Sequence, residues 1–452
     1  MSGVLSGAFA LTKAGVGELT IGGASANTYS GATTVNAGIL TLSGGSAIVD
    51  SAAVTVTAPG MLKLAASETI GSLSGDGPVN LQTSALTVGG SLTSVHSGVI
   101  SGTGVVPSFI KSGSGILTLS GANTFSGGST LNGGSLYVGN NAALGSGPIA
   151  MSGGITLASD STTARTLANG YSLGASVTLG DGTNNGPLTL LGAGTLTSNT
   201  TLTVNSDVVL SGVIGGGALS LTKLGTGALT LGGANTFSGG TAVNAGSVHV
   251  GHDAAFGTGT VAITDSTVAS DSTTARTVAN SYSFGGAVTL GHVTKTGVLT
   301  FTGTGLLSSN TTLTTLSDVA LQGVVGGGAF SLTKLGAGSL TLNGANTFSG
   351  GATISAGSVY VGNNSAFGNV AGVLRIAGAS VASTAATGAG GDRTIANPYE
   401  LSGLVSMGDA TKTGRLTFTG AGSLTSDVTV TASSGELAGF HADARRGWVH
   451  GI

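Results

Sequence analysis

Apolar and polar residues alternate over short stretches of this chain, and glycine or asparagine ends each stretch. In Leu229–Leu231 the two leucines share one face and the threonine lies on the other, as in a strand with one buried face. Gly232 and Gly233 break this strand, and Asn244–Gly246 separates the next two. Turns with a positive φ favour these residue types. The pattern predicts an all-β chain of short strands and Gly-rich turns.

One stretch of about 30 residues occurs four times. Each copy contains a lysine, then Gly-x-Gly, an apolar-Thr-apolar triplet, the marker Asn-Thr-aromatic-Ser-Gly and a final short strand. We expect structural roles for these positions, with the aromatic rings in the core and the asparagine amides lining a turn or forming a ladder. The units lie near residues 11–42, 110–139, 221–251 and 332–362, and their recurring side chains are Lys13, Lys111, Lys223 and Lys334; Asn27, Asn123, Asn235 and Asn346; and Tyr29, Phe125, Phe237 and Phe348.

A second block lies between these units. It reads SDSTTARTLANGYSLGASVTLG from Ser159 and SDSTTARTVANSYSFGGAVTLG from Ser270, with a looser copy from Gly390. The full period is therefore about 111 residues, and each period contains several shorter strand-and-turn units. Such similar tandem copies suit an architecture that grows by stacking one unit on the next.

Two folds can use this pattern: a parallel β-helix and an antiparallel sandwich built of hairpins. A sandwich usually has longer strands and a more aromatic core than this chain supplies. In a β-helix each short strand pairs with its counterpart one coil away, so inward aliphatic residues form continuous columns and only the two ends expose edges. We therefore predict a parallel β-helix, or solenoid, over residues 1–438.

Composition is compatible with this fold and removes several classes of function. Of 452 residues, 84 are glycine and 7% are charged, and the net charge of −3 gives no electrostatic case for a nucleic-acid partner. There is no cysteine, which excludes disulfides, thiolate metal sites and cysteine nucleophiles. No apolar run reaches the roughly 18 residues of a transmembrane helix. The opening MSGVLSGAFALTKAG lacks the features of a signal peptide.

The run Lys-x-Gly-x-Gly-x-Leu-Thr-Leu-x-Gly-x-Asn-Thr-Phe/Tyr-Ser-Gly-Gly, with Val-Asn-Ala-Gly at Val35–Gly38 and Val243–Gly246, resembles a known repeat. This is the autotransporter-associated β-strand repeat, or passenger-associated transport repeat, of type V secreted proteins in Gram-negative bacteria. Glu68–Leu81 and the Arg-Thr-aliphatic-Ala-Asn blocks also look like that family. The resemblance implies a secreted or surface-exposed, right-handed β-helix whose repeats help the passenger to fold and to move outward through the outer membrane.

Both ends of the chain depart from the family pattern. A complete member has an N-terminal export signal and a C-terminal β-barrel in the outer membrane, and we expect the parent protein to be attached to such a barrel, which this chain lacks. Residues 439–452 form an atypical tail with the only tryptophan, two of the six histidines and an adjacent arginine pair. We interpret it as a truncated or frame-shifted end; a natural cap and a His/Arg site are the alternatives.

Candidates for enzyme chemistry are few. Asp160 and Asp271 recur in equivalent blocks, as do Arg165 and Arg276. A polysaccharide-cleaving β-helix would need carboxylates on neighbouring coils, within roughly 5–10 Å of each other. The two aspartates are about five coils apart, or about 24 Å. We therefore expect them to form Asx turns or an Asp–Arg contact beside a bend.

Metal sites are also not predicted. His249 and His252 suggest a metal pair, but other copies carry tyrosine and asparagine there, and residues three apart in a strand face opposite sides. Asp181, in GDGTNNG, suggests calcium, but the matching stretch of the next copy is GHVTKTG. No catalytic, cofactor-binding or metal-binding residue is predicted, and no cofactor.

One candidate ligand surface remains. Tyr137, His249 and Tyr360 occupy the outward position of one strand in three copies. Exposed in register, they would form a ridge able to stack on sugars or on a partner protein. The alternative is ordinary outward β surface.

The sequence thus predicts a non-enzymatic stalk: a passenger fragment that supports secretion across the outer membrane and display at the cell surface. Two alternatives stay open, an adhesive or self-associating surface protein and a β-helical polysaccharide-degrading enzyme. The sequence identifies no host-surface or self-association partner.

Overall fold

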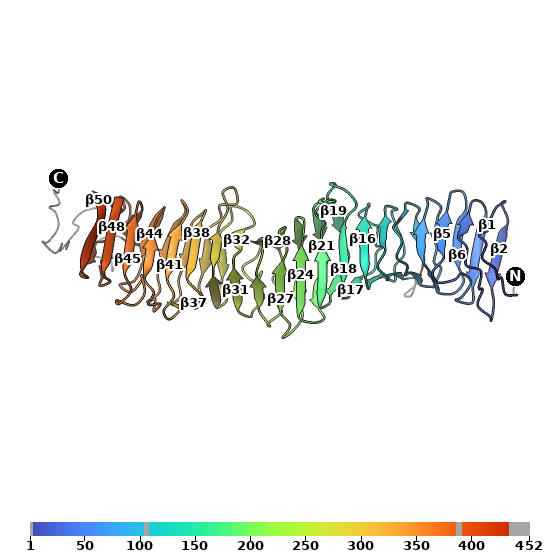
Figure 1. The fold of residues 1–452 in the computed structure, drawn as a ribbon, viewed down its shortest axis with the longest axis horizontal. Coiled ribbons are helices and arrows are strands. Elements are labelled where there is room, and N and C mark those ends of the chain that lie inside the picture. Colours follow the sequence, from blue (N-terminus) through green and yellow to red (C-terminus); the bar gives the residue numbers. More distant parts are fainter. Residues whose placement is uncertain (1–2, 104–107, 386–390, 434–452) are drawn as a thin grey trace. The chain divides into compact units, whose positions relative to one another are not determined.

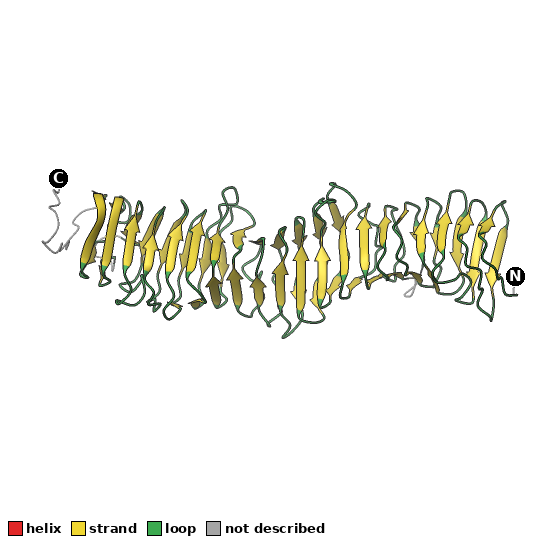
Figure 2. Cartoon of the chain, viewed as in Figure 1, coloured by secondary structure: helices red, strands yellow, loops and turns green. Residues whose placement is uncertain are grey.

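The computed structural model describes residues 3–103, 108–385 and 391–433. In these residues the chain forms short strands and no helix, and Figure 2 shows the strands joined by loops. The described part of the chain accordingly has no helix long and apolar enough to cross a membrane. The chain divides into two compact units, unit 1 (Met1–Phe237) and unit 2 (Ser238–Ile452).

Unit 1 is built of strands that stack on counterparts from neighbouring coils. Five ladders of hydrogen-bonded strands run through it, and Figure 1 labels many of their members. The ladders are β1 (Leu11–Lys13), β3 (Thr33–Val35), β5 (Ala53–Val56) and β8 (Ser72–Ser74); β2 (Glu18–Gly22), β4 (Ile39–Ser43), β6 (Met61–Leu64), β9 (Val79–Asn80) and β12 (Ile100–Ser101); β7 (Glu68–Ile70), β10 (Leu86–Val88), β13 (Phe109–Lys111), β15 (Ser129–Leu131), β17 (Ile149–Met151), β20 (Tyr171–Leu173), β23 (Gly194–Leu196) and β26 (Ile214–Gly215); β11 (Ser94–His96), β14 (Ile116–Leu119), β16 (Gly134–Val138), β18 (Ile155–Ser159), β21 (Ser176–Leu179), β24 (Thr200–Val204) and β27 (Leu221–Leu224); and β19 (Arg165–Leu167), β22 (Leu188–Leu190), β25 (Val208–Leu210) and β28 (Ala228–Leu231).

Unit 2 repeats this construction. Its ladders are β29 (Thr241–Val243), β31 (Val261–Thr264), β34 (Tyr282–Gly285), β37 (Gly305–Leu307) and β40 (Val325–Gly326); β30 (Ser247–Val250), β32 (Thr267–Ser270), β35 (Ala287–Leu290), β38 (Thr311–Thr315), β41 (Leu332–Leu335), β43 (Ala352–Ile354), β45 (Leu374–Ala377), β48 (Tyr399–Met407) and β50 (Gly422–Ala432); β33 (Arg276–Val278), β36 (Leu299–Phe301), β39 (Val319–Leu321), β42 (Ser339–Leu342), β44 (Ser358–Val361) and β46 (Ser380–Ser383); and β47 (Arg393–Ile395) with β49 (Leu416–Phe418).

The strands within each unit pair in parallel and in register. Phe109 of β13 faces Ser129 of β15, and Ile149 of β17 faces Tyr171 of β20, each about one coil further along the chain. Parallel pairing at this spacing is the geometry of a solenoid, in which every coil passes each face once. The prediction of an all-β parallel β-helix is confirmed. The predicted tail at 439–452 lies outside the described residues.

The core follows from the alternation seen in the sequence. In β24, Thr200, Leu202 and Val204 are buried while Thr201 and Thr203 are half-buried on the outer face. Aliphatic side chains of successive coils therefore lie above one another, and large rings are buried among them. The fully buried rings in the described chain include Phe109, Phe125, Phe237, Phe256, Phe284, Phe301, Phe348 and Phe367.

The four 30-residue units do not all use the same faces. In unit 1, Lys111 lies on β13, which stacks between β10 and β15, whereas Lys223 lies on β27, which stacks on β24. These pairs belong to different ladders. The repeat can therefore occupy different ladders of the solenoid while its lysine stays at the same position within the repeat.

Candidate functional site

Each 30-residue unit contains a buried lysine. Lys13, Lys111, Lys223 and Lys334 are 6%, 1%, 0% and 0% exposed. Lys334 Nζ donates to the carbonyl oxygens of the next two residues, Leu335 and Gly336, at 2.9 Å each. A third bond of 3.1 Å reaches the carbonyl of Ala356 in the next coil. An ammonium group has three N–H donors, and all three are used here.

Lys13 and Lys111 have the same arrangement, and Lys223 makes the same bonds within its own turn. Lys111 bonds the carbonyls of Ser112 and Gly113 in its own turn and that of Gly133 in the next coil, at 2.6, 3.0 and 3.1 Å. Lys13 reaches Ala37 across the coils at 2.9 Å, and Lys223 bonds the carbonyls of its own turn. Each cation therefore neutralises a cluster of carbonyl dipoles at a bend. We call this arrangement the lysine clamp.

A glycine in the next coil makes room for the lysine clamp. Gly357 follows Ala356 and has a φ of 67°. A Cβ atom at this position would lie 2.5 Å from the carbonyl oxygen of Gly336 and 3.0 Å from Lys334 Nζ. Gly134 has the same relation to Lys111, with a φ of 69°. Both the backbone conformation and the close approach therefore require glycine here.

Burial changes the acidity of these lysines. Removal from water disfavours the charged form and lowers the pKa of Lys111, Lys223 and Lys334 from 10.5 to about 8. In the described part of the chain, no carboxylate forms an ion pair with Lys111 or Lys334. The carbonyl oxygens alone stabilise these charges.

The marker asparagine joins three successive coils. Asn346 is 3% exposed, and its Oδ1 accepts from the N–H of Val325, 21 residues earlier, at 2.8 Å. Its Nδ2 donates to the carbonyl of Ala366, 20 residues later, at 2.7 Å. The marker segment forms no strand, and the amide adds to the few backbone bonds, such as that from the Thr347 N–H to the Val325 carbonyl, that join it to the preceding coil. We call this arrangement the asparagine clamp.

Other copies of the marker make equivalent bonds. Asn123 joins the N–H of Ile100 at 2.8 Å to the carbonyl of Ala143 at 2.6 Å. Asn27 does the same with Leu5 and Ala47, and Asn235 accepts from the N–H of Ile214 at 2.8 Å. These amides thus bind the backbone of adjoining coils. One alternative from the sequence was a ladder in which the amides bond one another. The bonds in the structure instead join each amide to backbone N–H and carbonyl groups.

The aromatic residue of the marker lies in the core. Phe125, Phe237 and Phe348 are fully buried, and Tyr29 is 4% exposed. The Tyr29 hydroxyl shares a 2.8 Å hydrogen bond with Thr33 Oγ1, which satisfies the polar group that phenylalanine lacks. The ring and the amide are two residues apart, so the asparagine clamp is anchored beside the core.

A second set of buried amides was not predicted. Asn169 and Asn280 each donate from Nδ2 to two carbonyls of the preceding coil, Gly145 and Gly147 at 3.0 and 2.6 Å, and Gly257 and Gly259 at 3.0 and 2.6 Å. Asn397 makes the same pair of bonds to Asn369 and Gly372. The available signal was their recurrence in the Arg-Thr-aliphatic-Ala-Asn block.

Two buried ionisable residues in unit 1 had no repeat signal at all. Glu68 is 3% exposed and accepts hydrogen bonds from the N–H groups of Ala47 and Ile48, at 3.2 and 2.9 Å. His96 is fully buried on β11, where burial lowers its pKa to about 4. Each occurs once, so no internal copy pointed to it.

The recurring aspartates form ion pairs. Asp160 Oδ1 lies 2.8 Å from Arg165 Nη2, and Asp271 Oδ1 lies 2.9 Å from Arg276 Nη2. Each pair closes the loop between two strands. The predicted Asp–Arg contact beside a bend is confirmed.

The expected exposed ridge is not present as such. His249 is 7% exposed, and Tyr137 and Tyr360 are half-buried. A loop that lies 44 to 49 residues further along the chain covers each of them. Asp181 accepts from the Tyr137 hydroxyl at 3.2 Å, Lys295 Nζ lies 2.7 Å from His249 Nδ1, and Asp409 accepts from the Tyr360 hydroxyl at 3.1 Å. The sequence could not show that a later coil returns over this position.

The suggested metal ligands have other partners. His252 Nδ1 accepts from the N–H of Ala254 at 3.0 Å, the bond that Asn140 Oδ1 makes with Ala142 in another copy. Asp181 Oδ1 accepts from the N–H groups of Thr183 and Asn184, both at 2.8 Å. Within the described residues no three His, Cys, Asp or Glu side chains gather as a metal site would require.

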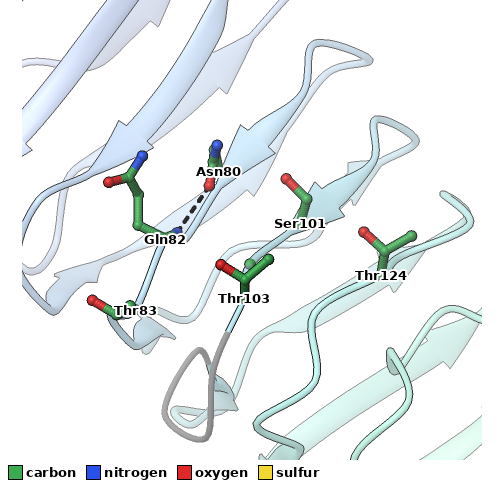
Figure 3. Close-up of a pocket in the computed structure, with 7 residues that line it drawn as sticks. Asn80, Gln82, Thr83, Ser101, Thr103 and Thr124 are labelled. Atoms are coloured by element: carbon green, nitrogen blue, oxygen red, sulfur yellow. Dashed lines mark hydrogen bonds between the residues drawn. The ribbon is translucent and has the colours of Figure 1, made fainter.

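A polar hollow of about 490 Å³ lies on unit 1 (Figure 3). Asn80, Gln82 and Thr83 line one part of it, and Ser101, Thr103 and Thr124 line another. The Gln82 N–H donates to Asn80 Oδ1 at 2.9 Å. None of these lining side chains is ionisable near neutral pH, so they supply no general acid or base.

Comparison with protein families gives four matches to the passenger-associated-transport-repeat, at residues 11–42, 109–138, 221–250 and 332–361. The chain therefore carries four copies of this repeat. The resemblance seen in the sequence is thus confirmed. Searches of curated proteins and of solved structures gave no match.

In this chain the passenger-associated transport repeat contains the side chains that form the two clamps. Each match contains one lysine clamp and one marker asparagine. Its glycines provide the turns and the close approach, and its aromatic residue anchors the amide in the core. The residues that define the repeat are therefore those that connect coils to one another.

The lysine clamp predicts an increase in stability at alkaline pH. The unfolded chain keeps these lysines charged up to a pKa near 10.5, whereas the folded chain releases their protons near pH 8. Between these values the unfolded state binds more protons, so the free energy of unfolding rises with pH. We expect about 2 kcal/mol per lysine between pH 8 and 10, measured by urea denaturation at each pH.

Lys334→Met provides the control and should reduce this rise by one lysine's share. Above about pH 10 the trend should reverse, because burial raises the pKa of Tyr171 and Tyr282 and the unfolded chain then loses tyrosine protons first. A rise of the same size in Lys334→Met would show that the lysine clamp is not its source.

The asparagine clamp predicts a large cost for removing one amide. Asn346→Ala leaves the buried N–H of Val325 and the carbonyl of Ala366 without their partner. We expect unit 2 to lose about 3 kcal/mol, measured by chemical denaturation. Asn343→Ala is the matched control, because that amide bonds only the exposed side chain of Gln322 and should change stability by less than about 0.5 kcal/mol. Equal effects of the two substitutions would contradict the stabilising role given to the Asn346 amide.

Proposed function

We propose that this chain is a non-enzymatic stalk, the β-helical passenger part of an autotransporter, which supports secretion across the outer membrane and display at the cell surface. The family match and the parallel solenoid support this proposal. A surface or extracellular location, and attachment of the parent protein to an outer-membrane β-barrel, belong to the same proposal.

The observation that carries the proposal is the position of the clamps in the matched repeats. The lysine clamp of Lys334 is completed only when the coil containing Ala356 is in place, and the asparagine clamp of Asn346 only when both neighbouring coils are. A folded coil that carries a clamp therefore presents unfilled hydrogen-bonding positions to the next one. Growth by nearest-neighbour addition is the folding behaviour expected of a solenoid.

This behaviour suits a chain that crosses a membrane in an extended form. Coils that emerge one at a time can add to those already folded, and the hydrogen bonds of each clamp then oppose retreat of the chain. The clamps need no charged partner or cofactor, so they form wherever backbone carbonyl and N–H groups meet them.

The test is to place the chain between an export signal and an outer-membrane β-barrel in a Gram-negative bacterium. The amount displayed is measured by protease accessibility on intact cells. We expect Lys334→Met with Asn346→Ala to reduce display several-fold and Asn343→Ala to leave it unchanged. Wild-type display of the clamp variant would contradict a role of the repeats in secretion.

The same cells distinguish the alternative functions. Aggregation of cells that display the chain, or their attachment to a host surface, would establish an adhesive role in addition to the stalk. Cleavage of an acidic polysaccharide that is lost in Asp160→Asn would establish an enzyme and overturn the proposal. Asp160 forms an ion pair with Arg165, and this pairing favours a structural role for Asp160 over a catalytic one.

A further inference from the structure

One loop recurs three times with different chemistry. It begins at the glycine after a strand and covers the outward side chain of an earlier coil. In two copies a tyrosine meets an aspartate: Tyr137 with Asp181 at 3.2 Å, and Tyr360 with Asp409 at 3.1 Å. The middle copy, residues 291–297, has histidines in both places; we call it the histidine loop.

The aspartate has two tasks in its loop. Asp409 Oδ2 accepts from the Tyr360 hydroxyl, and Oδ1 accepts from the N–H groups of Thr411 and Lys412 at 2.8 and 3.0 Å. The Lys412 ammonium lies over the Tyr360 ring, 3.0 Å from its centroid. The carboxylate therefore shapes the turn and holds the tyrosine, and the lysine of the same turn lies over the tyrosine ring.

In the histidine loop, imidazole nitrogens take over these acceptor positions. His292 Nδ1 accepts from the N–H groups of Thr294 and Lys295, at 3.1 and 3.3 Å. Lys295 Nζ lies 2.7 Å from His249 Nδ1. Since N–H and ammonium groups can only donate, Nδ1 of both histidines must carry a lone pair. The arrangement requires both imidazoles to be neutral.

Protonation removes both acceptors and adds charge. A protonated His292 has no lone pair for the turn, and a protonated His249 faces the Lys295 ammonium as a second cation. The two rings are also close to each other, with centroids 6.1 Å apart. Histidine is the side chain whose charge ordinarily changes between pH 5 and 8.

Other ionisable groups of unit 2 near the histidine loop are held by structural partners. The adjoining loop contributes Asp271, which is paired with Arg276 at 2.9 Å, and contacts the histidine loop through the Ser272 carbonyl and the Gly297 N–H. On the turn after β30, His252 bonds Ala254, and Asp253 bonds the N–H of Thr277. Each of these groups already has a structural partner.

We propose that the histidine loop is an acid-sensitive latch, closed over β30 when His249 and His292 are neutral and released when they are protonated. The two aspartate loops should stay closed under the same conditions. Hydrogen bonds from Thr411 and Lys412 lower the pKa of Asp409 to about 2, so it keeps its charge in mild acid. Unit 2 thus contains a sensitive loop and an insensitive copy of it.

The test is hydrogen exchange of the full chain, followed by mass spectrometry at pH 7.5 and pH 5.0, with exchange times scaled to the intrinsic rates. We expect peptides covering residues 291–297 to lose protection on the order of tenfold at pH 5.0. Peptides covering residues 408–414 should be unchanged and serve as the internal reference.

The double variant His249→Tyr/His292→Asp recreates the pair found at Tyr360 and Asp409 and keeps Lys295. We expect it to retain protection of residues 291–297 at both pH values, and each single variant to retain it in part. The proposal is overturned if wild-type protection of the loop does not fall at pH 5.0, if it falls equally in the double variant, or if all of unit 2 loses protection together.

Discussion

Hydrogen bonding of the backbone between strands is the constraint on which this solenoid depends. Strands satisfy their N–H and C=O groups by pairing with the coils on either side, but a bend pairs only some of its backbone groups in this way. A bend buried between two coils also has no water to bond. This chain satisfies the bend with side chains whose polar ends reach the neighbouring coils, as Lys334 does with Ala356 and Asn346 does with Val325 and Ala366.

The unusual composition follows from this constraint. Charge is scarce in part because the clamps use a cation against neutral carbonyls, and in the described part of the chain no carboxylate pairs with Lys111 or Lys334. Outer strand positions such as Thr201 and Thr203 carry threonine. Glycine is abundant partly because the clamps bring backbones close together: at Gly357 a single Cβ atom would lie 2.5 Å from a carbonyl oxygen. The core consists mostly of aliphatic residues, so aromatic residues are few, although buried rings such as Phe256 and Phe301 also lie outside the repeat marker.

Much of the fold could be predicted because its rules are local. Alternation in stretches such as Leu229–Leu231 indicates a strand with one buried face, and internal repetition indicates stacking. The Asp160–Arg165 contact was also predictable, since both residues lie in one short loop.

The contacts that could not be predicted from the sequence are those between residues of different coils, because they depend on which residues the stacking places side by side. A lysine in a strand normally indicates surface, and nothing local shows that Lys111 turns inward to three carbonyls. Tyr137 was expected to be exposed because the loop that covers it is 44 residues away. Glu68 and His96 each occur once, so comparison between copies gave no warning of their burial.

Lys334 and Asn346 join specific neighbouring coils. Native-state hydrogen exchange of Lys334→Met/Asn346→Ala, read residue by residue, measures this directly. We predict loss of protection confined to the coils that hold Val325, Gly336, Ala356 and Ala366, with unit 1 unchanged. Unchanged protection in these coils, or an equal loss along the whole chain, would contradict it.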